Sequence, residues 1–364
     1  MTKKVAVDRI EAAAFTIPTD GPEADGTLSW DSTTIVVAHA YAGGERGLGY
    51  TYTHSAAAKL IETKLAEAVR GCDAMAVAGA SAAMVKEVRN LGRPGLASAA
   101  ISAVDTALWD LKARLLGIPL PGLLGSVRDA IPVYGSGGFT SYSIDRLQRQ
   151  LGDWVAAGIS RVKMKIGSAP SEDPDRVRAA RAAIGAQAEL FVDANGAYDR
   201  KEALAQAEKF GEQGVAWFEE PVSSDDLAGL RLLRDRVPSG MEVAAGEYGY
   251  DLFYFRRMLE AGAVDVLQAD ATRCGGVSGF LKAGALCEAY ALPLSAHTAP
   301  SVHAHLCCAL PKARHIEYFH DHARIEQMLF DGAQAPVDGL LRPDAARPGL
   351  GLELRENEAR RYAA

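Results

Sequence analysis

The sequence predicts an α/β protein in which a smaller α+β domain precedes a (β/α)8-type barrel, the TIM-barrel architecture. Short apolar runs of β character recur over the second two thirds of the chain, and most are separated by Ala-, Leu- and Arg-rich stretches with helical periodicity. Eight such runs, spaced by roughly 20–30 residues, are typical of a barrel of parallel strands. A doubly wound open sheet would instead carry a Gly-rich phosphate turn after its first strand, and the segment YGSGGFTS (134–141) does not fit that pattern.

The predicted barrel strands are short, as expected for strands that run from the bottom to the top of a barrel. They lie at 132–135, 161–166, 190–193, 216–219, 242–245, 264–269, 292–296 and 315–318. Helical patterns such as 173–185 and 200–214 fill the intervals.

The first part of the chain has a different pattern. Residues 1–60 are β-rich, and the apolar run 33–42 follows a polar segment, 18–32, that we expect to be a loop. Helical patterns then occur at 55–70, 79–92 and 95–117, and Gly and Pro break them at 117–125. We therefore predict an α+β domain over 1–125 and a barrel domain over 126–337, with the tail 338–364 packing back on the first domain.

The bulk composition excludes several classes of protein. Of the 364 residues, 48% are hydrophobic and 23% charged, as in soluble globular proteins, and the net charge of −7 argues against nucleic acid as the main partner. No apolar run approaches the ~20 residues that span a bilayer, and the N-terminus lacks the apolar core of a signal peptide. We expect a cytoplasmic protein with no membrane partner. The odd number of cysteines, with no CxxC pair, indicates reduced and mostly packed thiols rather than a zinc site.

An ionisable side chain lies at the end of every predicted strand from the second to the eighth. The second strand presents Lys163 and Lys165 on one face, because side chains alternate along a strand. The later strands carry, in order, Asp193, Glu219, Glu247, Asp270, His297 and Glu317. Singly, each has an ordinary explanation as an edge-strand, turn or solvated charge. Seven strand ends in phase predict one site at the carboxyl face of the barrel, where barrel enzymes have their active sites.

The residue types indicate the chemistry of that site. Three carboxylates on adjacent strands, Asp193, Glu219 and Glu247, form an all-oxygen site that suits Mg²⁺. Asp270 would orient the His297 ring and raise its basicity. A second lysine and a nearby cation would both lower the pKa of a lysine. Two bases beside one metal ion suit abstraction of the proton alpha to a carboxylate, and a protonated Glu317 could donate a hydrogen bond to the enediolate that forms.

These motifs together resemble the mandelate racemase-like branch of the enolase superfamily. The resemblance covers essentially the whole chain, and it rests on VKMKIG, FVDANGAYD, WFEEP, AAGE, VDVLQADATRCGGVSG, SAH and IEYF, and on AISAVDTALWDLKARLLGIPLPGLLG in the first domain. It implies a modified (β/α)7β barrel with an N-terminal capping domain. It also implies one Mg²⁺ per subunit, a small carboxylate substrate and a homo-oligomer, a dimer or an octamer.

The resemblance also implies roles for the site residues. Asp193, Glu219 and Glu247 would ligate Mg²⁺. Lys165, assisted by Lys163, and His297, paired with Asp270, would be the two opposed acid/base groups. Glu317 would bind the substrate carboxylate. Predicted substrate contacts are Tyr50, Tyr52, Ser136 and Asn195, and Glu220 would support the metal ligands. We expect His303, His305, His320 and His322 to be structural or surface residues.

In such proteins the capping-domain loops close over the barrel, and the polar segment 18–32 favours a polyol acid as substrate. We therefore predict an acid-sugar dehydratase acting on an aldonate, aldarate or uronate, with a racemase or epimerase of a 2-hydroxy acid, or a lactone cycloisomerase, as the alternative. Two other classes stay open: an aldolase that forms a Schiff base on Lys165, and a descendant that binds a ligand without catalysis.

Overall fold

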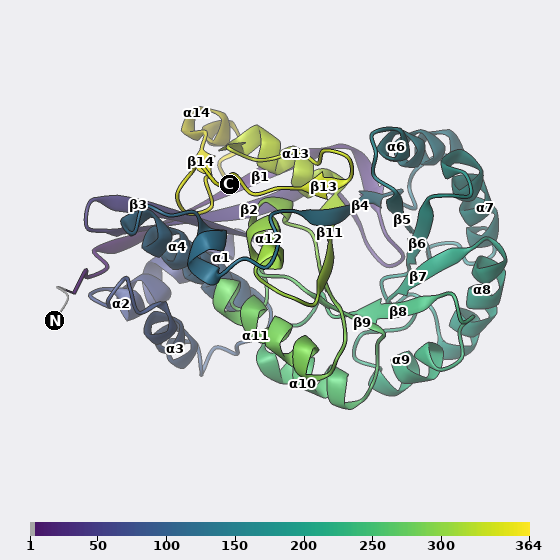
Figure 1. Ribbon diagram of the computed structural model, residues 1–364, viewed down its shortest axis with the longest axis horizontal. Coiled ribbons are helices and arrows are strands. Elements are labelled where there is room, and N and C mark those ends of the chain that lie inside the picture. Colours follow the sequence, from purple (N-terminus) through teal and green to yellow (C-terminus); the bar gives the residue numbers. More distant parts are fainter. Residues whose placement is uncertain (1–3) are drawn as a thin grey trace.

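Residues 131–319 form a closed barrel of eight parallel strands in the computed structural model, which describes residues 4–364 (Figure 1). The strand order follows the chain, and pairing of the last strand with the first, as in Ile316 with Val133, closes the barrel. The strands are β4 (Ile131–Gly137), β5 (Arg161–Lys165), β6 (Glu189–Asp193), β7 (Val215–Glu219), β8 (Glu242–Ala245), β9 (Val266–Ala269), β10 (Leu294–Ala296) and β11 (Ala313–Phe319). Each overlaps one of the predicted runs, so the predicted fold class is confirmed.

Helices connect successive strands and cover the outside of the barrel (Figure 1). They are α6 (Ile144–Ala156), α7 (Asp173–Ile184), α8 (Arg200–Glu212), α9 (Leu227–Arg234), α10 (Leu252–Glu260), α11 (Gly276–Ala289) and α12 (Pro300–Cys308), and α13 (His320–Leu329) follows the last strand. Ser143, Asp199, Asp226 and Asp251 begin four of them, because each side chain accepts a hydrogen bond from a backbone N–H of the first turn.

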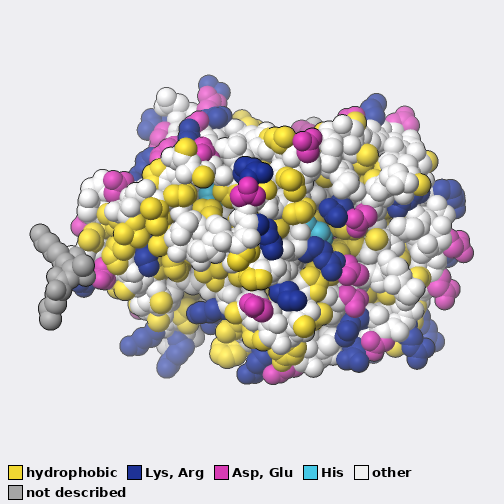
Figure 2. All heavy atoms as spheres, in the orientation of Figure 1, with side chains coloured by type: hydrophobic (Ala, Val, Ile, Leu, Met, Phe, Trp, Pro, Cys, Tyr) yellow, Lys and Arg dark blue, Asp and Glu magenta, His cyan; other side chains and the backbone are white. Residues whose placement is uncertain are grey.

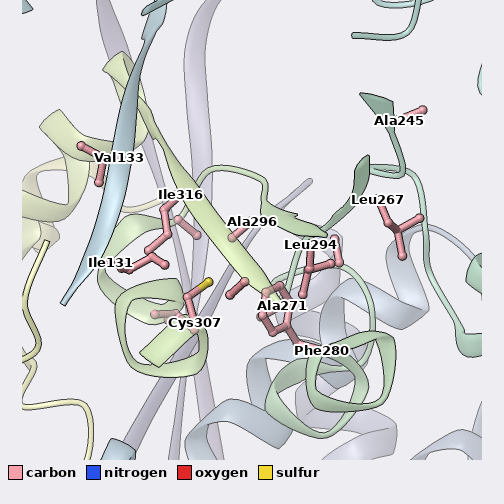
Figure 3. Close-up of a cluster of buried hydrophobic side chains, with 14 of the residues drawn as sticks. Ile131, Val133, Ala245, Leu267, Ala271, Phe280, Leu294, Ala296, Cys307 and Ile316 are labelled. Carbon is pink, nitrogen blue, oxygen red and sulfur yellow. The ribbon is translucent and has the colours of Figure 1, made fainter. Parts of the chain in front are cut away.

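The barrel core has two parts. Outside the strands, Leu294 and Ile316 pack against Phe280 of α11 and Cys307 of α12 (Figure 3). Inside, Phe191 and Trp217 stack with ring centroids 5.2 Å apart, beside Tyr134. The Lys163 ammonium lies 5.4 Å from the centre of the Tyr134 ring, so these aromatic rings form the apolar floor on which the charged residues rest.

The first domain is a three-stranded antiparallel sheet covered by helices. Its strands are β1 (Arg9–Ala24), β2 (Ser29–Ala42) and β3 (Glu45–Tyr52), and its helices are α1 (Ala56–Leu60), α2 (Ala66–Val69), α3 (Val77–Glu87), α4 (Leu96–Leu115) and α5 (Leu120–Leu124), with a π-helical turn at Ile61–Leu65. Gly47 and Gly49 let α4 lie directly on β3, since a Cβ at Gly49 would overlap the carbonyl oxygen of Ala103.

The segment 18–32 is not the loop that the sequence predicts. The strands β1 and β2 continue through it with a register shift between Pro18 and Glu23, and only a turn at 25–28 separates them. Asp25 closes that turn, because its Oδ1 accepts hydrogen bonds from the backbone N–H groups of Thr27 and Leu28. The polar composition is misleading because this hairpin lies beyond the sheet that the helices cover, so neither face has to be continuously apolar.

The β1–β2 hairpin reaches from the first domain to the barrel, as the purple ribbon in Figure 1 shows. The backbone N–H of Thr140 donates to the carbonyl of Ala24 (2.8 Å), and Asp20 accepts hydrogen bonds from Arg146 (3.0 Å) and pairs with His320 (2.9 Å). The hairpin is therefore seated on the rim formed by the segments that follow β4 and β11.

The C-terminal segment contacts both parts of the chain. Strand β13 (Leu340–Leu341) pairs with β4 of the barrel, and β14 (Glu353–Leu354) pairs with β12 (Phe330–Asp331). The last residues, after α14 (Glu356–Ala359) and a 3-10 turn at Arg360–Tyr362, return to the first domain, where Ala363 forms a bridge with Phe15. Among residues 4–364, no helix is long and apolar enough to cross a membrane. Acidic and basic side chains are interspersed on the face shown in Figure 2.

Candidate active site

The strand register brings the predicted site residues together at one end of the barrel. Lys165 pairs with Asp193 across β5 and β6, and Asp193 pairs with Glu219 across β6 and β7. Three more follow the ends of β8, β9 and β10, namely Glu247, Asp270 and His297, and Glu317 lies in β11. All are buried, as is Lys163. Buried charges need partners or a bound ion, so this cluster is not a solvated rim.

Asp193, Glu219 and Glu247 form the candidate metal centre. One carboxylate oxygen from each lies within 4.8 Å of the others. Burial, and then the neighbouring Asp193, raises the pKa of Glu219 to about 8, which is the result of crowding negative charge in an apolar barrel. The Glu247 Oε2 atom is buried, and its polar side-chain neighbour His297 Nε2 lies 3.2 Å away. An all-oxygen cluster with excess negative charge fits a hard divalent cation such as Mg²⁺.

The backbone after these strands is shaped to present the ligands. Asn195 and Glu220 have positive φ angles of 47° and 37°, although neither is glycine. The Asn195 N–H donates to Asp193 Oδ1 (2.9 Å). Gly246, which precedes Glu247, has a φ angle of 137°, and a Cβ on this residue would overlap the carbonyl oxygen of Gln268. The Trp217 indole N–H donates to Glu219 Oε2 (2.9 Å) and so orients that carboxylate from the barrel floor.

The two lysines lie against the carboxylates. Lys163 Nζ is 2.5 Å from Glu219 and 2.8 Å from Glu317, and Lys165 contacts Asp193. Burial is the largest single influence on the pKa of Lys165 and lowers it, but Asp193, Glu247 and Glu317 together outweigh it, and the net direction is upward. This direction is opposite to the expected lowering. The Asp193 carboxylate is in direct contact with the Lys165 ammonium group and stabilises its charge.

His297 and Asp270 form the predicted pair. His297 Nδ1 is 2.8 Å from Asp270 Oδ2, and the N–H and hydroxyl of Thr272 both donate to the other carboxylate oxygen at 2.7 Å. The imidazole Nε2 atom therefore points to the metal centre, 3.2 Å from Glu247. Burial lowers the pKa of His297, but Glu247 and the other nearby carboxylates raise it to about 9.

A second buried histidine supports this pair. His303 Nδ1 donates to the carbonyl of Thr298 (2.7 Å), and its Nε2 accepts from the N–H of Ala271 (2.8 Å). Thr298 and Ala299, with φ angles of 49° and 39°, are left-handed, and the His303 bridge holds this strained turn beside His297. His303 thus has the structural place that the sequence predicts.

The surroundings of Glu317 favour its ionised form, in contrast to the expected protonated donor. Burial raises its pKa, but Lys163, and then His297 and Lys165, lower it to about 2. Its Oε1 accepts hydrogen bonds from Lys163 and from the hydroxyl of Ser136 (2.6 Å). A carboxylate beside an ammonium group stays charged even when buried, so Glu317 here is an acceptor.

A cavity of about 740 Å³ lies between the barrel mouth and the hairpin. Lys165, Glu247, His297 and Glu317 line its barrel side. Of the predicted substrate contacts, Tyr52 and Asn195 line it too. Tyr50 and Ser136 do not: both are fully buried, Tyr50 donates to Glu326 (2.7 Å) and Ser136 to Glu317.

Sequence reasoning missed several residues of this cavity. They are Trp30, Tyr248, Arg273, Thr298, Phe319 and His322. His322 corrects the expectation of a structural or surface role, since its ring stacks on Tyr52 with centroids 3.4 Å apart and faces the cavity. It lies in a helix rather than at a strand end, so strand-end phasing carries no signal for it. Arg273 lies only three residues after Asp270 in the sequence, and this proximity to a predicted site residue could have indicated that Arg273 lines the cavity.

Comparisons with known proteins agree with this geometry. Residues 18–125 match the mandelate racemase/muconate lactonizing enzyme N-terminal domain, and residues 146–358 match the enolase C-terminal domain-like family. The chain is similar to a 3,6-anhydro-alpha-L-galactonate cycloisomerase from Streptomyces coelicolor, with 32% identity over 96% of this chain and 97% of the relative.

Two solved structures are also similar. A mandelate racemase/muconate lactonizing enzyme-like protein from Rubrobacter xylanophilus is 56% identical with a TM-score of 0.96, over 98% of this chain and 99% of the other. The L-talarate/galactarate dehydratase from Salmonella typhimurium, liganded with Mg and L-lyxarohydroxamate, is 29% identical with a TM-score of 0.91, over 100% and 94% of the two chains. The chain belongs to the mandelate racemase/muconate lactonizing enzyme family of the enolase superfamily.

Proposed function

We propose that this protein is an Mg²⁺-dependent acid-sugar dehydratase. The observation that carries the proposal is the placement of two proton-transfer groups, Lys165 on β5 and His297 after β10, on either side of the three-carboxylate cluster. Lys165 contacts Asp193 at one end of the cluster, and His297 contacts Glu247 at the other. Bound Mg²⁺ would supply positive charge for the carboxylate of a substrate whose α-proton is removed.

The residues of the chain divide the reaction between them. Lys165 Nζ, once deprotonated, takes the α-proton, and the electrons of the C–H bond move into the substrate carboxylate. Lys163 holds that carboxylate with its charge. The β-C–O bond then breaks as the electrons return to form the Cα–Cβ double bond, and His297 Nε2 gives a proton to the departing hydroxide. The product is an enol of a 2-keto-3-deoxy acid and one water. The carboxylates around His297 shift its pKa upward, and this direction favours the proton donation that a general acid performs.

The second candidate is a cycloisomerase, because a relative with that name aligns over nearly the whole chain. Loss of an internal ether oxygen from the β-carbon after the same proton abstraction would open a ring without releasing water. A racemase would return the proton from the opposite face instead. Loss of the elements of water separates dehydration from the other two outcomes, and NMR distinguishes a ring-opened product from the epimer of the starting material.

The experiment is incubation of the Mg²⁺-loaded protein in D2O with a panel of aldonic, aldaric and uronic acids, anhydro acids and mandelate, followed by NMR and mass spectrometry. We expect a 2-keto-3-deoxy product from at least one sugar acid. A product that has not lost water, either ring-opened or α-deuterated, would replace dehydration with cycloisomerisation or racemisation. Activity that survives EDTA and is trapped by borohydride would indicate the Schiff-base alternative, and the absence of any exchange would indicate a binding protein.

The expected homo-oligomer stays a prediction. Light scattering after size-exclusion chromatography distinguishes a monomer of 38.6 kDa from a dimer or an octamer.

A further inference from the structure

The lysine and the arginine that line the cavity of the candidate active site both lie on its barrel side. On the barrel side lie Lys165, Glu247, Arg273, His297 and Glu317. The opposite side, which we call the cap wall, consists of hairpin and β3-end residues and of two barrel residues. These residues are Leu28, Trp30, Thr34, Tyr52, Phe319 and His322. A substrate whose reacting carboxylate lies at the metal centre has its far end at this wall.

The cap wall offers hydrogen bonds without a fixed positive charge. The His322 ring is held between Tyr52, which stacks on it, and Phe319, whose ring meets it edge-on at 5.1 Å between centroids. Its Nδ1 atom is buried without a partner, and burial lowers its pKa to about 3, so the ring is neutral. Two titratable side chains also line the cavity on this side: Asp25, whose Oδ1 accepts from the Thr27 and Leu28 N–H groups, and His54, whose Nδ1 accepts from the Ala56 N–H.

The two strong cations that line the cavity are both engaged on the barrel side. Lys165 contacts Asp193, and its proposed role requires it to give up its charge. Arg273 Nη1 lies 3.2 Å from Glu247, and its Nε lies 3.6 Å from Asp270. Among residues 4–364, no other lysine or arginine lines this cavity.

From this contrast we infer that the substrate is a monocarboxylic polyol acid, of the aldonate type, and not an aldaric diacid. The second carboxylate of a diacid would lose its hydration at a wall to which the described residues contribute no lysine or arginine, and next to the negative charge of Asp25. A terminal hydroxyl group, by contrast, can donate to or accept from His322 and Thr34. This inference rests on the proposed function. The family does not decide the question, since similar proteins are named for a galactonate derivative and for galactarate.

The test compares matched acids that differ only at C6. The Mg²⁺-loaded full-length protein is assayed with galactonate and galactarate, with gluconate and glucarate, and with a further set of hexonates and pentonates beside their diacids. We expect kcat/KM for the best monoacid to exceed that of its diacid by at least about 100-fold, the usual result of an unpaired buried charge.

A charge placed on the cap wall gives an independent measurement. Leu28 is 68% exposed and lines the cavity, so Leu28→Arg adds a cation without disturbing the core. We expect it to raise kcat/KM for the diacid relative to the monoacid by about 10-fold, and Leu28→Gln, similar in length but neutral, to leave that ratio unchanged.

The outcomes separate the inference from the proposed function. Dehydration of a diacid as fast as, or faster than, its monoacid by the unmodified protein would overturn the inference and leave the dehydratase proposal in place. In that case Arg273 would be the residue that reads the second carboxylate, and Arg273→Gln would reduce diacid turnover selectively. Loss of water from no acid of either kind would overturn the proposed function and, with it, the inference.

Discussion

The barrel mouth and the hairpin that covers it are built on opposite principles. At the mouth, eight ionisable side chains are buried within contact of one another, and their pKa values move in both directions. The hairpin contributes the neutral Leu28, Trp30 and Thr34 and one charged residue, Asp25, and it is fixed by hydrogen bonds to the rim of the barrel. The comparison indicates that the barrel determines the reaction, because proton transfer needs coupled charges, while the hairpin determines which substrate fits.

The largest effect is expected from removing the proton-transfer groups of the mouth. Lys165→Ala and His297→Asn should each reduce proton abstraction from one epimer at C2 by at least about 1000-fold, while exchange from the other epimer persists. The measurement is α-proton exchange in D2O with pairs of C2 epimers. Loss of exchange on the same epimer in both variants would contradict the arrangement of bases on two faces.

The next effect concerns the three-carboxylate cluster. Glu219→Gln should weaken Mg²⁺ binding by about 10–100-fold, measured by calorimetric titration, because an amide replaces a carboxylate in the ligand set. EDTA should abolish activity, and added Mg²⁺ should restore it.

A matched control is available one residue further along. Glu220 follows Glu219 directly and is also buried, but its carboxylate is not one of the three whose oxygens converge at the cluster. Glu220→Gln should therefore change Mg²⁺ binding much less than Glu219→Gln. An equal loss of Mg²⁺ affinity in the two variants would contradict the assignment of Glu219 as a metal ligand.

The contrast between the two regions also explains what the sequence can predict. Barrel strands run in parallel and in register, so residues at their carboxyl ends lie at the same level along the barrel axis. The positions of Asp193, Glu219 and His297 at strand ends therefore predicted that they lie close together. The hairpin has no such rule. Its position depends on contacts between residues far apart in the chain, such as Asp20 with Arg146, and its polar composition led to a predicted loop.

The spacing of the two tyrosines in β3 also led to a prediction that the structure corrects, for a related reason. Tyr50 and Tyr52 lie on the same face of β3, and both were predicted to touch the substrate. Two residues along a strand, however, are far enough apart for one to line the cavity and the other to be buried on Phe330 and Glu326. Which one reaches the cavity depends on where α13 packs, and strand periodicity contains no information about that.

A smaller effect tests the electrostatics of the hairpin. Glu23 is almost fully buried, its Oε2 accepts from the Trp30 indole N–H (2.8 Å), and burial, followed by Asp321, raises its pKa to about 8. The folded protein thus holds this proton more tightly than the unfolded chain does. Its contribution to stability is complete below the unfolded pKa near 4.5 and is lost as the pH rises to 8.

Glu23→Gln keeps the neutral form at every pH. The melting temperature of the variant relative to the unmodified protein should therefore increase between pH 5 and pH 8, by about 2–4 °C. Differential scanning calorimetry at several pH values measures this change. A constant difference across the range would mean that Glu23 is ionised in the folded protein.

The smallest effect separates the two tyrosines of β3. Tyr50→Phe removes the hydroxyl that donates to Glu326, leaving that oxygen with only the distant Tyr52 hydroxyl at 3.4 Å, and should lower the free energy of unfolding by about 1–2 kcal/mol. It should not change KM, since Tyr50 does not line the cavity. Replacing Tyr52 by Leu removes the ring that stacks on His322, and it should raise KM while changing stability by a similar amount. Denaturant unfolding and steady-state kinetics measure both quantities. A raised KM in Tyr50→Phe would show that the substrate reaches behind the cap wall to Tyr50. Glu326, which accepts the Tyr50 hydrogen bond, would then belong to the substrate site.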